Sequence, residues 1–136
     1  MSSKRNIHVV AAIIEHSNEI LAVQRGRSKF VYLTGKFEFP GGKVEEGETP
    51  EQAILREIQE ELLLDIKILD EFIIVQHEYP DFQVTMQCFR CTTKERNLTL
   101  TEHTAHHWLP ISKLPSLDWA EADVPIVNEL VSLTTR

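Results

Sequence analysis

Short runs of apolar residues, separated by polar turns, fill most of this chain. Residues 7–14 form the clearest run, rich in β-branched side chains, and Ser17 and Asn18 mark the turn that follows it. The tripeptide Pro-Gly-Gly at residues 40–42 ends another run abruptly. The pattern as a whole predicts strands at residues 7–14, 20–24, 37–39, 66–78, 84–92, 98–100 and 107–109, with residues 66–78 forming one strand or two.

A helical period begins after the Pro-Gly-Gly turn. Thr49 is a good N-cap, Pro50 suits the first helical position, and Gln52 completes a capping box with Thr49. We therefore predict a helix from residue 50 to about residue 63. Its buried face is expected to carry Leu55, Ile58 and Leu62.

The order of these elements indicates the fold class. A single helical turn is expected at residues 111–114 and a last helix at residues 123–133. Strands on both sides of a central helix, with a second helix at the end, favour an α/β fold with helices packed on a mixed sheet. A length of 136 residues suits a single domain, which we expect to span residues 1–136.

Composition and charge narrow the possible partners. No apolar run approaches the roughly 20 residues that span a bilayer, and the first residues do not form a signal peptide, so we expect no membrane partner and a cytoplasmic location. A net charge of −7 argues against a nucleic-acid polymer, which requires a basic surface. Cys88 and Cys91 have the spacing of a redox or zinc motif, but side chains three apart in a strand point to opposite faces.

The predicted helix at 50–63 carries an unusual acidic stripe. At 100° per residue, Glu57, Glu60 and Glu61 lie within a stripe about 100° wide, and Arg56 lies beside it. Like charges at this spacing repel each other, so the stripe is either a solvated surface or a site for a divalent cation. Gly41 and Gly42 would let the backbone approach such an ion closely. The residues alone leave both interpretations open.

The same segment resembles the signature of the Nudix hydrolase family, Gly-x5-Glu-x7-Arg-Glu-U-x-Glu-Glu-x-Gly-U, where U is aliphatic. Leu63 departs from the pattern, because the family has glycine there to end the helix in a left-handed conformation. A leucine pays a steric penalty for that conformation, so the helix is expected to end differently or to run one residue further. The matching positions are Gly42, Glu48, Arg56, Glu57, Ile58, Glu60, Glu61 and Leu64.

Segments around the signature look like the MutT branch of that family. They are residues 37–43 and 47–52, together with the tail at 119–127, which looks like CTP pyrophosphohydrolase and related 8-oxo-dGTP diphosphatases. The resemblance covers most of residues 7–130. It implies the Nudix α/β/α sandwich, with a mixed sheet between helices, and hydrolysis of a nucleoside triphosphate to monophosphate and pyrophosphate.

The resemblance also implies roles for the signature residues. Glu57, Glu60 and Glu61 match the family's metal-binding carboxylates, and the carbonyl of Gly41 matches a further ligand. The implied ion is Mg²⁺, with Mn²⁺ as a substitute. Arg56 matches the arginine that holds these carboxylates in place, and Glu48 matches an acid that braces the preceding loop.

The sequence leaves two candidates for the base that activates the attacking water. In the family this role varies between a signature glutamate and an acid on a distant loop, so Glu57 and Glu102 are the candidates. Three histidines follow Glu102, at residues 103, 106 and 107, and we expect them to lie at the surface or at an interface. Arg25, Arg27 and Lys29 are either triphosphate contacts or solubilising loop charges.

Substrate choice is expected to depend on residues outside the signature. Asp123 matches the position that recognises the base in the MutT branch, but it would also serve as an N-cap of the last helix. As an ionised carboxylate it would accept hydrogen bonds from the amine of cytosine or the N7 proton of 8-oxoguanine. Phe82, with Tyr79 and Trp119, is a candidate for stacking on the base.

We therefore expect a nucleotide-pool enzyme acting on CTP, dCTP or oxidised dGTP as a monomer or homodimer. The alternatives are hydrolysis of a dinucleoside polyphosphate or nucleotide sugar, and a non-catalytic nucleotide-binding module.

Overall fold

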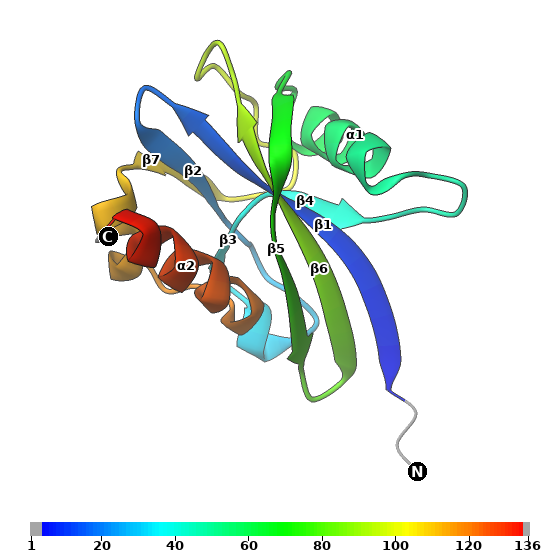
Figure 1. Ribbon diagram of the computed structural model, residues 1–136. Coiled ribbons are helices and arrows are strands. Elements are labelled where there is room, and N and C mark those ends of the chain that lie inside the picture. Colours follow the sequence, from blue (N-terminus) through cyan, green and yellow to red (C-terminus); the bar gives the residue numbers. More distant parts are fainter. Residues whose placement is uncertain (1–3, 135–136) are drawn as a thin grey trace.

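One mixed β-sheet forms the centre of the molecule, and a helix covers each of its faces (Figure 1). The computed structural model describes residues 4–134. The strands are β1 (Arg5–His16), β2 (Glu19–Gln24), β3 (Phe37–Glu38), β4 (Gly41–Lys43), β5 (Lys67–Glu78), β6 (Phe82–Thr92) and β7 (Ala105–Leu109). The α-helices are α1 (Pro50–Leu62) and α2 (Val124–Thr134), and short 3₁₀ helices are η1 (Val31–Leu33), η2 (Ile111–Ser116) and η3 (Glu121–Asp123).

The sheet contains a point where two strands diverge. β1 and β2 pair beside their shared turn, at Glu15–Ile20 and His16–Glu19. Further along, β2 pairs with β3 and β7, whereas β1 pairs with β4 and, in parallel, with β6. The segment from β3 to β4 crosses from one strand to the other, and the Pro40 carbonyl accepts a 2.8 Å hydrogen bond from the Ala12 amide. Several of the candidate site residues lie around this divergence.

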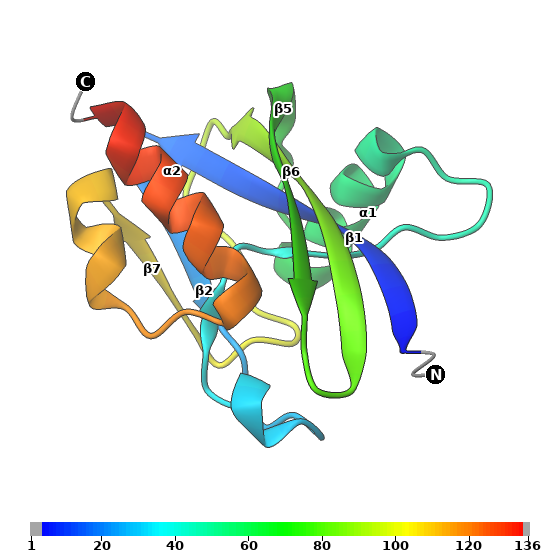
Figure 2. The same ribbon diagram turned by 60° about the horizontal axis from the view of Figure 1, so that its bottom comes forward.

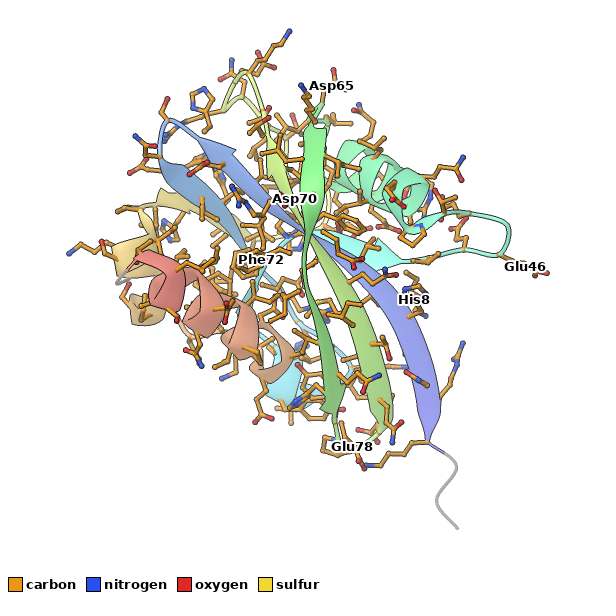
Figure 3. The ribbon with its side chains drawn as sticks, viewed as in Figure 1. His8, Glu46, Asp65, Asp70, Phe72 and Glu78 are labelled. Carbon is orange, nitrogen blue, oxygen red and sulfur yellow. The ribbon has the colours of Figure 1, made fainter. Side chains whose placement is uncertain are left out.

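Two apolar clusters pack on opposite faces of the sheet. Ile126, Val127 and Leu130 of α2 belong to one cluster, and Ile54, Ile58 and Leu62 of α1 belong to the other. Figure 2 shows the two helices on opposite sides of the strands. In Figure 3, Phe72 lies on the α2 side of β5 and packs against the first cluster, while His8 is exposed on the opposite face of β1. The α/β/α layering expected from the sequence is confirmed.

Cys88 and Cys91 confirm the strand geometry predicted for them. Both are buried free thiols, but Cys88 belongs to the α2-side cluster and Cys91 to the α1-side cluster. Their sulfurs therefore lie on opposite faces of β6, which excludes a shared metal or disulfide between them.

Helix α1 begins as predicted and ends in an unexpected way. The Thr49 side chain accepts from the Gln52 amide, and the Gln52 side chain accepts from the Thr49 amide, which is the predicted capping box. Leu63 follows the helix with φ 51° and ψ 44°, so it adopts the left-handed conformation that normally favours glycine. The prediction that leucine would change the helix end is wrong, because Leu63 takes the glycine conformation despite its steric cost.

Two other expectations about the elements are wrong, and one strand was not expected. Leu55 is 45% exposed, and the residues of α1 that pack on the sheet include Ile54 and Ile58 instead. The buried face of the helix therefore lies nearer to the acidic stripe than the sequence suggested. The Pro-Gly-Gly segment does not only end a strand, since Gly41–Lys43 forms β4 against β1. Residues 98–100 are not a strand, because their backbone bonds to the end of α1, with the Thr99 amide 2.9 Å from the Leu62 carbonyl.

The remaining elements lie where the pattern predicted them. Residues 66–78 form a single strand, β5, and the turn expected at 111–114 is the 3₁₀ helix η2. Within residues 4–134, no helix is both long and apolar enough to cross a membrane.

Candidate active site

A pocket of about 680 Å³ opens where β1 and β2 diverge. One end is bounded by Gly41, Gly42 and the C-terminal part of α1, and the other by η3. Residues proposed from the sequence that line the pocket include Arg25, Arg27, Gly41, Glu61, Phe82, Glu102 and Asp123. Arg56, Glu57 and Glu60 are not among the lining residues. The fold thus gathers in one cavity residues that are far apart along the chain.

Arg56 organises the loop before α1 and the first carboxylates of the helix. Its Nε atom donates to Glu48 Oε2 at 2.6 Å, and Nη1 donates to Glu57 Oε1 at 2.8 Å. Nη2 donates to the Lys43 carbonyl at 3.0 Å. These bonds raise the pKa of Arg56, with Glu48 the largest cause, and lower the pKa of Glu48. Arg56 and Glu48 therefore lie in the bracing positions that the resemblance implied.

The three glutamates of the acidic stripe lie in different environments. The side chain of Glu60 is 60% exposed and lies 3.2 Å from Arg56 Nη1, whereas Glu57 is half-buried with its side chain 16% exposed. Glu61 is buried, with only 5% of the residue exposed. The three carboxylates of the stripe therefore range from exposed to buried, a difference that the sequence periodicity did not indicate.

Glu61 is a carboxyl group in an unfavourable electrostatic environment. Its Oε2 atom is buried without a hydrogen-bond partner in the described residues. Burial, together with the charges of Glu38, Glu57 and Glu102, raises the pKa of Glu61 to about 9. Burial likewise raises the pKa of Glu57. A cation placed here would relieve both the repulsion and the lost hydration.

Glu102 approaches the helix from the loop between β6 and β7. The Thr101 amide donates to the Glu61 carbonyl at 3.0 Å, which fixes this loop over the last turn of α1. Glu102 is exposed, lines the pocket, and contributes to the raised pKa of Glu61. Glu57, the other candidate base, is not among the residues that line the pocket, although its charge also acts on Glu61.

Asp123 closes the opposite end. Its Oδ2 atom accepts a 2.9 Å hydrogen bond from the Phe39 amide, so this carboxyl group is directed toward β3. Burial raises the pKa of Asp123 well above its ordinary value. Burial therefore shifts this group toward the protonated acid, compared with an exposed aspartate. A protonated carboxyl group can both donate and accept hydrogen bonds.

Aromatic rings line the same end. Phe82 lies between Phe30 and Tyr79, with ring centroids 5.3 Å and 5.2 Å away. Tyr79 is 5% exposed, and its hydroxyl accepts from the Ala122 amide. Trp119 is buried against Phe39, with ring centroids 4.6 Å apart. Phe82 therefore keeps its candidacy for stacking, and Phe30 joins it from a loop that the sequence did not single out.

Sequence reasoning missed a half-buried charged group on the pocket wall. Glu38 accepts a 2.8 Å bond from Arg25 Nε and lies 2.9 Å from His103 Nε2. Burial acts to raise the pKa of Glu38, but the bonds from His103 and Arg25 outweigh it and leave that pKa below its ordinary value. The one available signal was Glu38 itself, an acid between two phenylalanines in a predicted strand.

The histidine prediction holds only in part. His107 is exposed, but the His103 side chain is 4% exposed, so the expectation that it lies at the surface is wrong. Its interior position follows from the ionised partner, Glu38, which compensates for the lost hydration of the ring.

The donor set fits a divalent cation. Glu61 presents a buried oxygen without a partner, and Glu57 and Glu102 stand beside it. A Cβ atom at Gly42 would collide with the Glu57 carboxylate, and one at Gly41 with the Val10 carbonyl, so these glycines permit the close packing. Across residues 4–134, no three His, Cys, Asp or Glu side chains are already drawn together as a ligand set. Hard oxygen donors of this kind suit Mg²⁺, which retains several waters and uses few protein ligands.

Comparison with known proteins identifies the family. Residues 4–130 match the family model described as the NUDIX domain. The chain belongs to the Nudix family. It is 39% identical to 8-oxo-dGTP diphosphatase of Proteus vulgaris over 73% of this chain and 88% of that protein. It is 32% identical to CTP pyrophosphohydrolase of Escherichia coli, over 93% of each chain.

Solved Nudix structures agree with the fold. A MutT protein of the Nudix hydrolase family from methicillin-resistant Staphylococcus aureus is 42% identical and superimposes with a TM-score of 0.73. That match covers 96% of this chain and 98% of the other. The present chain is therefore a Nudix hydrolase, of a family that generally requires a divalent metal.

Proposed function

We propose that this Nudix hydrolase is a Mg²⁺-dependent nucleoside triphosphate pyrophosphohydrolase that removes unwanted nucleotides from the cellular pool. One observation carries the proposal: a single pocket is lined by the carboxylates Glu61 and Glu102 at one end, with Glu57 acting on Glu61 from beside them, and by the buried Asp123 at the other. A triphosphate and a nucleobase need such different environments. The cytoplasmic location and the oligomeric state remain predictions.

The carboxylate end would carry out the cleavage. Glu57, Glu60 and Glu61, with the carbonyl of Gly41, would hold Mg²⁺, which neutralises charge on the phosphate oxygens when bound. Arg56 keeps Glu57 and Glu60 oriented, because separate N–H groups of its guanidinium reach each of them. Arg25 and Arg27 line the pocket and would contact the phosphates.

We assign the general base to Glu102. One carboxylate oxygen of Glu57 is already occupied, because Oε1 accepts a hydrogen bond from Arg56 Nη1. Glu102 is exposed and stands at the mouth of the site beside Glu61. It would take a proton from the water that attacks phosphorus, and the leaving group would be pyrophosphate.

Asp123 would select the base. Its Oδ2 atom is occupied by the Phe39 amide, so Oδ1 would face the ligand. In the protonated form favoured by burial, this group can donate one hydrogen bond, and in the ionised form it can only accept. Cytosine and 8-oxoguanine each present a donor beside an acceptor, which suits such a group. The related enzymes named for CTP and for 8-oxo-dGTP support these two substrate classes.

The test is a substrate panel with direct detection of products. CTP, dCTP, 5-methyl-dCTP, 8-oxo-dGTP, normal dGTP, ADP-ribose and a dinucleoside polyphosphate are each incubated with Mg²⁺ or with chelator. We expect pyrophosphate and a nucleoside monophosphate from a cytosine or oxidised guanine substrate, and no turnover with chelator. Hydrolysis of only the last two compounds would assign the site to other nucleoside diphosphate derivatives. Nucleotide binding without any turnover would make the chain a non-catalytic module.

A further inference from the structure

The loop that carries Glu102 is attached to its surroundings on either side of that residue. Before Glu102, the Thr101 hydroxyl lies 2.9 Å from the Glu60 carbonyl, and the Thr101 amide bonds to the Glu61 carbonyl at 3.0 Å. After Glu102, the Thr104 amide donates to the Gln24 carbonyl at 3.0 Å. The chain therefore bridges from the end of α1 to β2, and Glu102 lies in the middle of the bridge.

His103 supplies an anchor made by a side chain. Its Nε2 atom is 2.9 Å from Glu38 Oε2. Because an ionised carboxylate only accepts, Nε2 must be the donor. Glu38 is held in turn by Arg25 through Nε at 2.8 Å. The His103 side chain is 4% exposed, whereas its neighbour Glu102 is exposed.

We propose that His103 is a positioning residue for the hydrolysis, holding Glu102 beside Glu57 and Glu61 through its hydrogen bond to Glu38. This inference rests on the proposed function, since the place of Glu102 affects turnover only if the site cleaves a substrate. The physical reason is that adjacent residues share a backbone. A His103 ring that is fixed in the pocket wall restricts where the neighbouring Glu102 carboxylate can lie. A displacement of a catalytic group by about 1 Å can lower the rate about a hundredfold.

The competing explanation is that His103 only fills space. Two substitutions separate the explanations. His103→Gln retains a donor near the position of Nε2, whereas His103→Leu keeps bulk and loses the donor. His107→Leu is the matched control, because His107 lies on the neighbouring strand β7 and is exposed. Thermal unfolding checks that each variant folds, and His103→Asn, whose donor is too short to reach Glu38, replaces His103→Leu if that variant does not.

The first experiment measures position without any substrate. Amide hydrogen exchange is followed for residues 101–104 and for α1 in each variant. We expect exchange at residues 101–104 to rise about tenfold or more in His103→Leu, with α1 unchanged, because a lost anchor lets the loop open locally. His103→Gln should exchange close to the parent rate, as should His107→Leu. Unchanged exchange in His103→Leu would overturn the proposal even if the chain proves inactive on every nucleotide.

The second experiment asks whether His103 acts through Glu102. We expect His103→Leu to lower kcat by about tenfold to a hundredfold, with KM changing less and His103→Gln recovering most of the loss. In a Glu102→Gln background, His103→Leu should produce no further loss, since the group it positions is already absent. An equal loss in both backgrounds, or no loss in the parent, would overturn the proposal. Absence of turnover in the parent enzyme would instead refute the proposed function, and hydrogen exchange would still decide the anchor.

Discussion

At the scale of single residues, Glu102 is the group whose assignment is easiest to test. It is an exposed acid beside the buried Glu61, and its charge contributes to the raised pKa of that residue. We expect Glu102→Gln to lower kcat by about tenfold or more, since removing a positioned base has effects of this size. The measurement is pyrophosphate release under saturating Mg²⁺.

Glu95→Gln is the control for that substitution, because Glu95 is an exposed acid in the same connection between β6 and β7. It should leave kcat unchanged. Near-parent turnover in Glu102→Gln would remove Glu102 from the mechanism and return the role to Glu57.

Glu61 tests the metal site through stability rather than activity. A buried carboxyl group with a partnerless oxygen opposes folding, so Glu61→Gln should be at least as stable as the parent in chelator. Adding Mg²⁺ should stabilise the parent, by about 2.7 kcal/mol at a hundredfold excess over Kd. Glu61→Gln should gain much less, which reverses the order of the two proteins.

Thermal unfolding with and without Mg²⁺ measures both effects. Glu46→Gln is the control, because Glu46 is exposed at the tip of the loop before α1 (Figure 3) and does not line the pocket. Equal stabilisation of all three proteins by Mg²⁺ would place the ion elsewhere.

Asp123 makes stability depend on pH. Its folded pKa is raised by burial, whereas the unfolded value is about 3.9. The stability that the protonated group contributes is therefore fully present below about pH 3.9, and it falls as pH rises toward the folded pKa. Asp123→Asn removes this loss, so its stability relative to the parent should grow between acid and neutral pH.

Urea unfolding from acid to neutral pH checks this difference. Asp65→Asn is the control, an exposed aspartate just before β5 (Figure 3), and its difference from the parent should stay flat. A flat difference for Asp123→Asn as well would mean that the native pocket keeps this carboxylate ionised.

The site residues differ in how far the sequence could predict them. Gly41, Arg56, Glu57 and Glu61 lie in or beside the signature segment, where fixed spacing on a loop and helix determines their positions. The pair of Glu38 and His103 is separated by 65 positions in the chain and meets only because β2 pairs with both β3 and β7. No local pattern carries that information.

At the scale of elements, the end of α1 offers a prediction about backbone strain. Leu63 has φ 51°, and leucine pays about 1–2 kcal/mol for a left-handed conformation. Leu63 is 53% exposed, so truncation removes little burial. We expect Leu63→Gly to stabilise the protein by about 0.5–1 kcal/mol, after allowing for the greater freedom of glycine in the unfolded chain.

Leu55→Gly is the matched control for that change. Leu55 is 45% exposed but lies inside α1, where glycine costs about 1 kcal/mol. Urea unfolding should therefore show opposite signs for two leucines of similar exposure. Destabilisation by both would mean that the Leu63 side chain makes contacts that outweigh its strain.

The elements themselves were predictable where the local pattern decides them. Thr49 and Gln52 form reciprocal side-chain to backbone hydrogen bonds across three positions, so the start of α1 follows from local sequence. Residues 98–100 alternate like a strand, and Leu98 and Leu100 do pack against the α1-side cluster. Their backbone, however, finds carbonyl partners at the end of α1, and apolar periodicity does not specify which backbone partner a segment will find.

At the scale of the whole molecule, the two cysteines report on cooperativity. Cys88 packs under α2 and Cys91 under α1, so each thiol is protected by a different layer. Burial raises the pKa of Cys91 to about 12 and raises that of Cys88 as well, which leaves little reactive thiolate near neutral pH. Both thiols should become reactive only when α1 and α2 detach from the sheet.

If residues 4–134 unfold as one unit, both thiols should react with iodoacetamide at the same rate under native conditions. That rate should follow the free energy of global unfolding as urea is added. Mass spectrometry of each cysteine peptide separates the two rates. Cys91→Ser and Cys88→Ser, tested singly, should leave the remaining thiol with the unfolding-limited rate of its own variant. Faster labelling of Cys88 alone would mean that α2 detaches while α1 and the carboxylates of the site stay folded, and the base-binding end of the pocket would then open independently of the cleavage end.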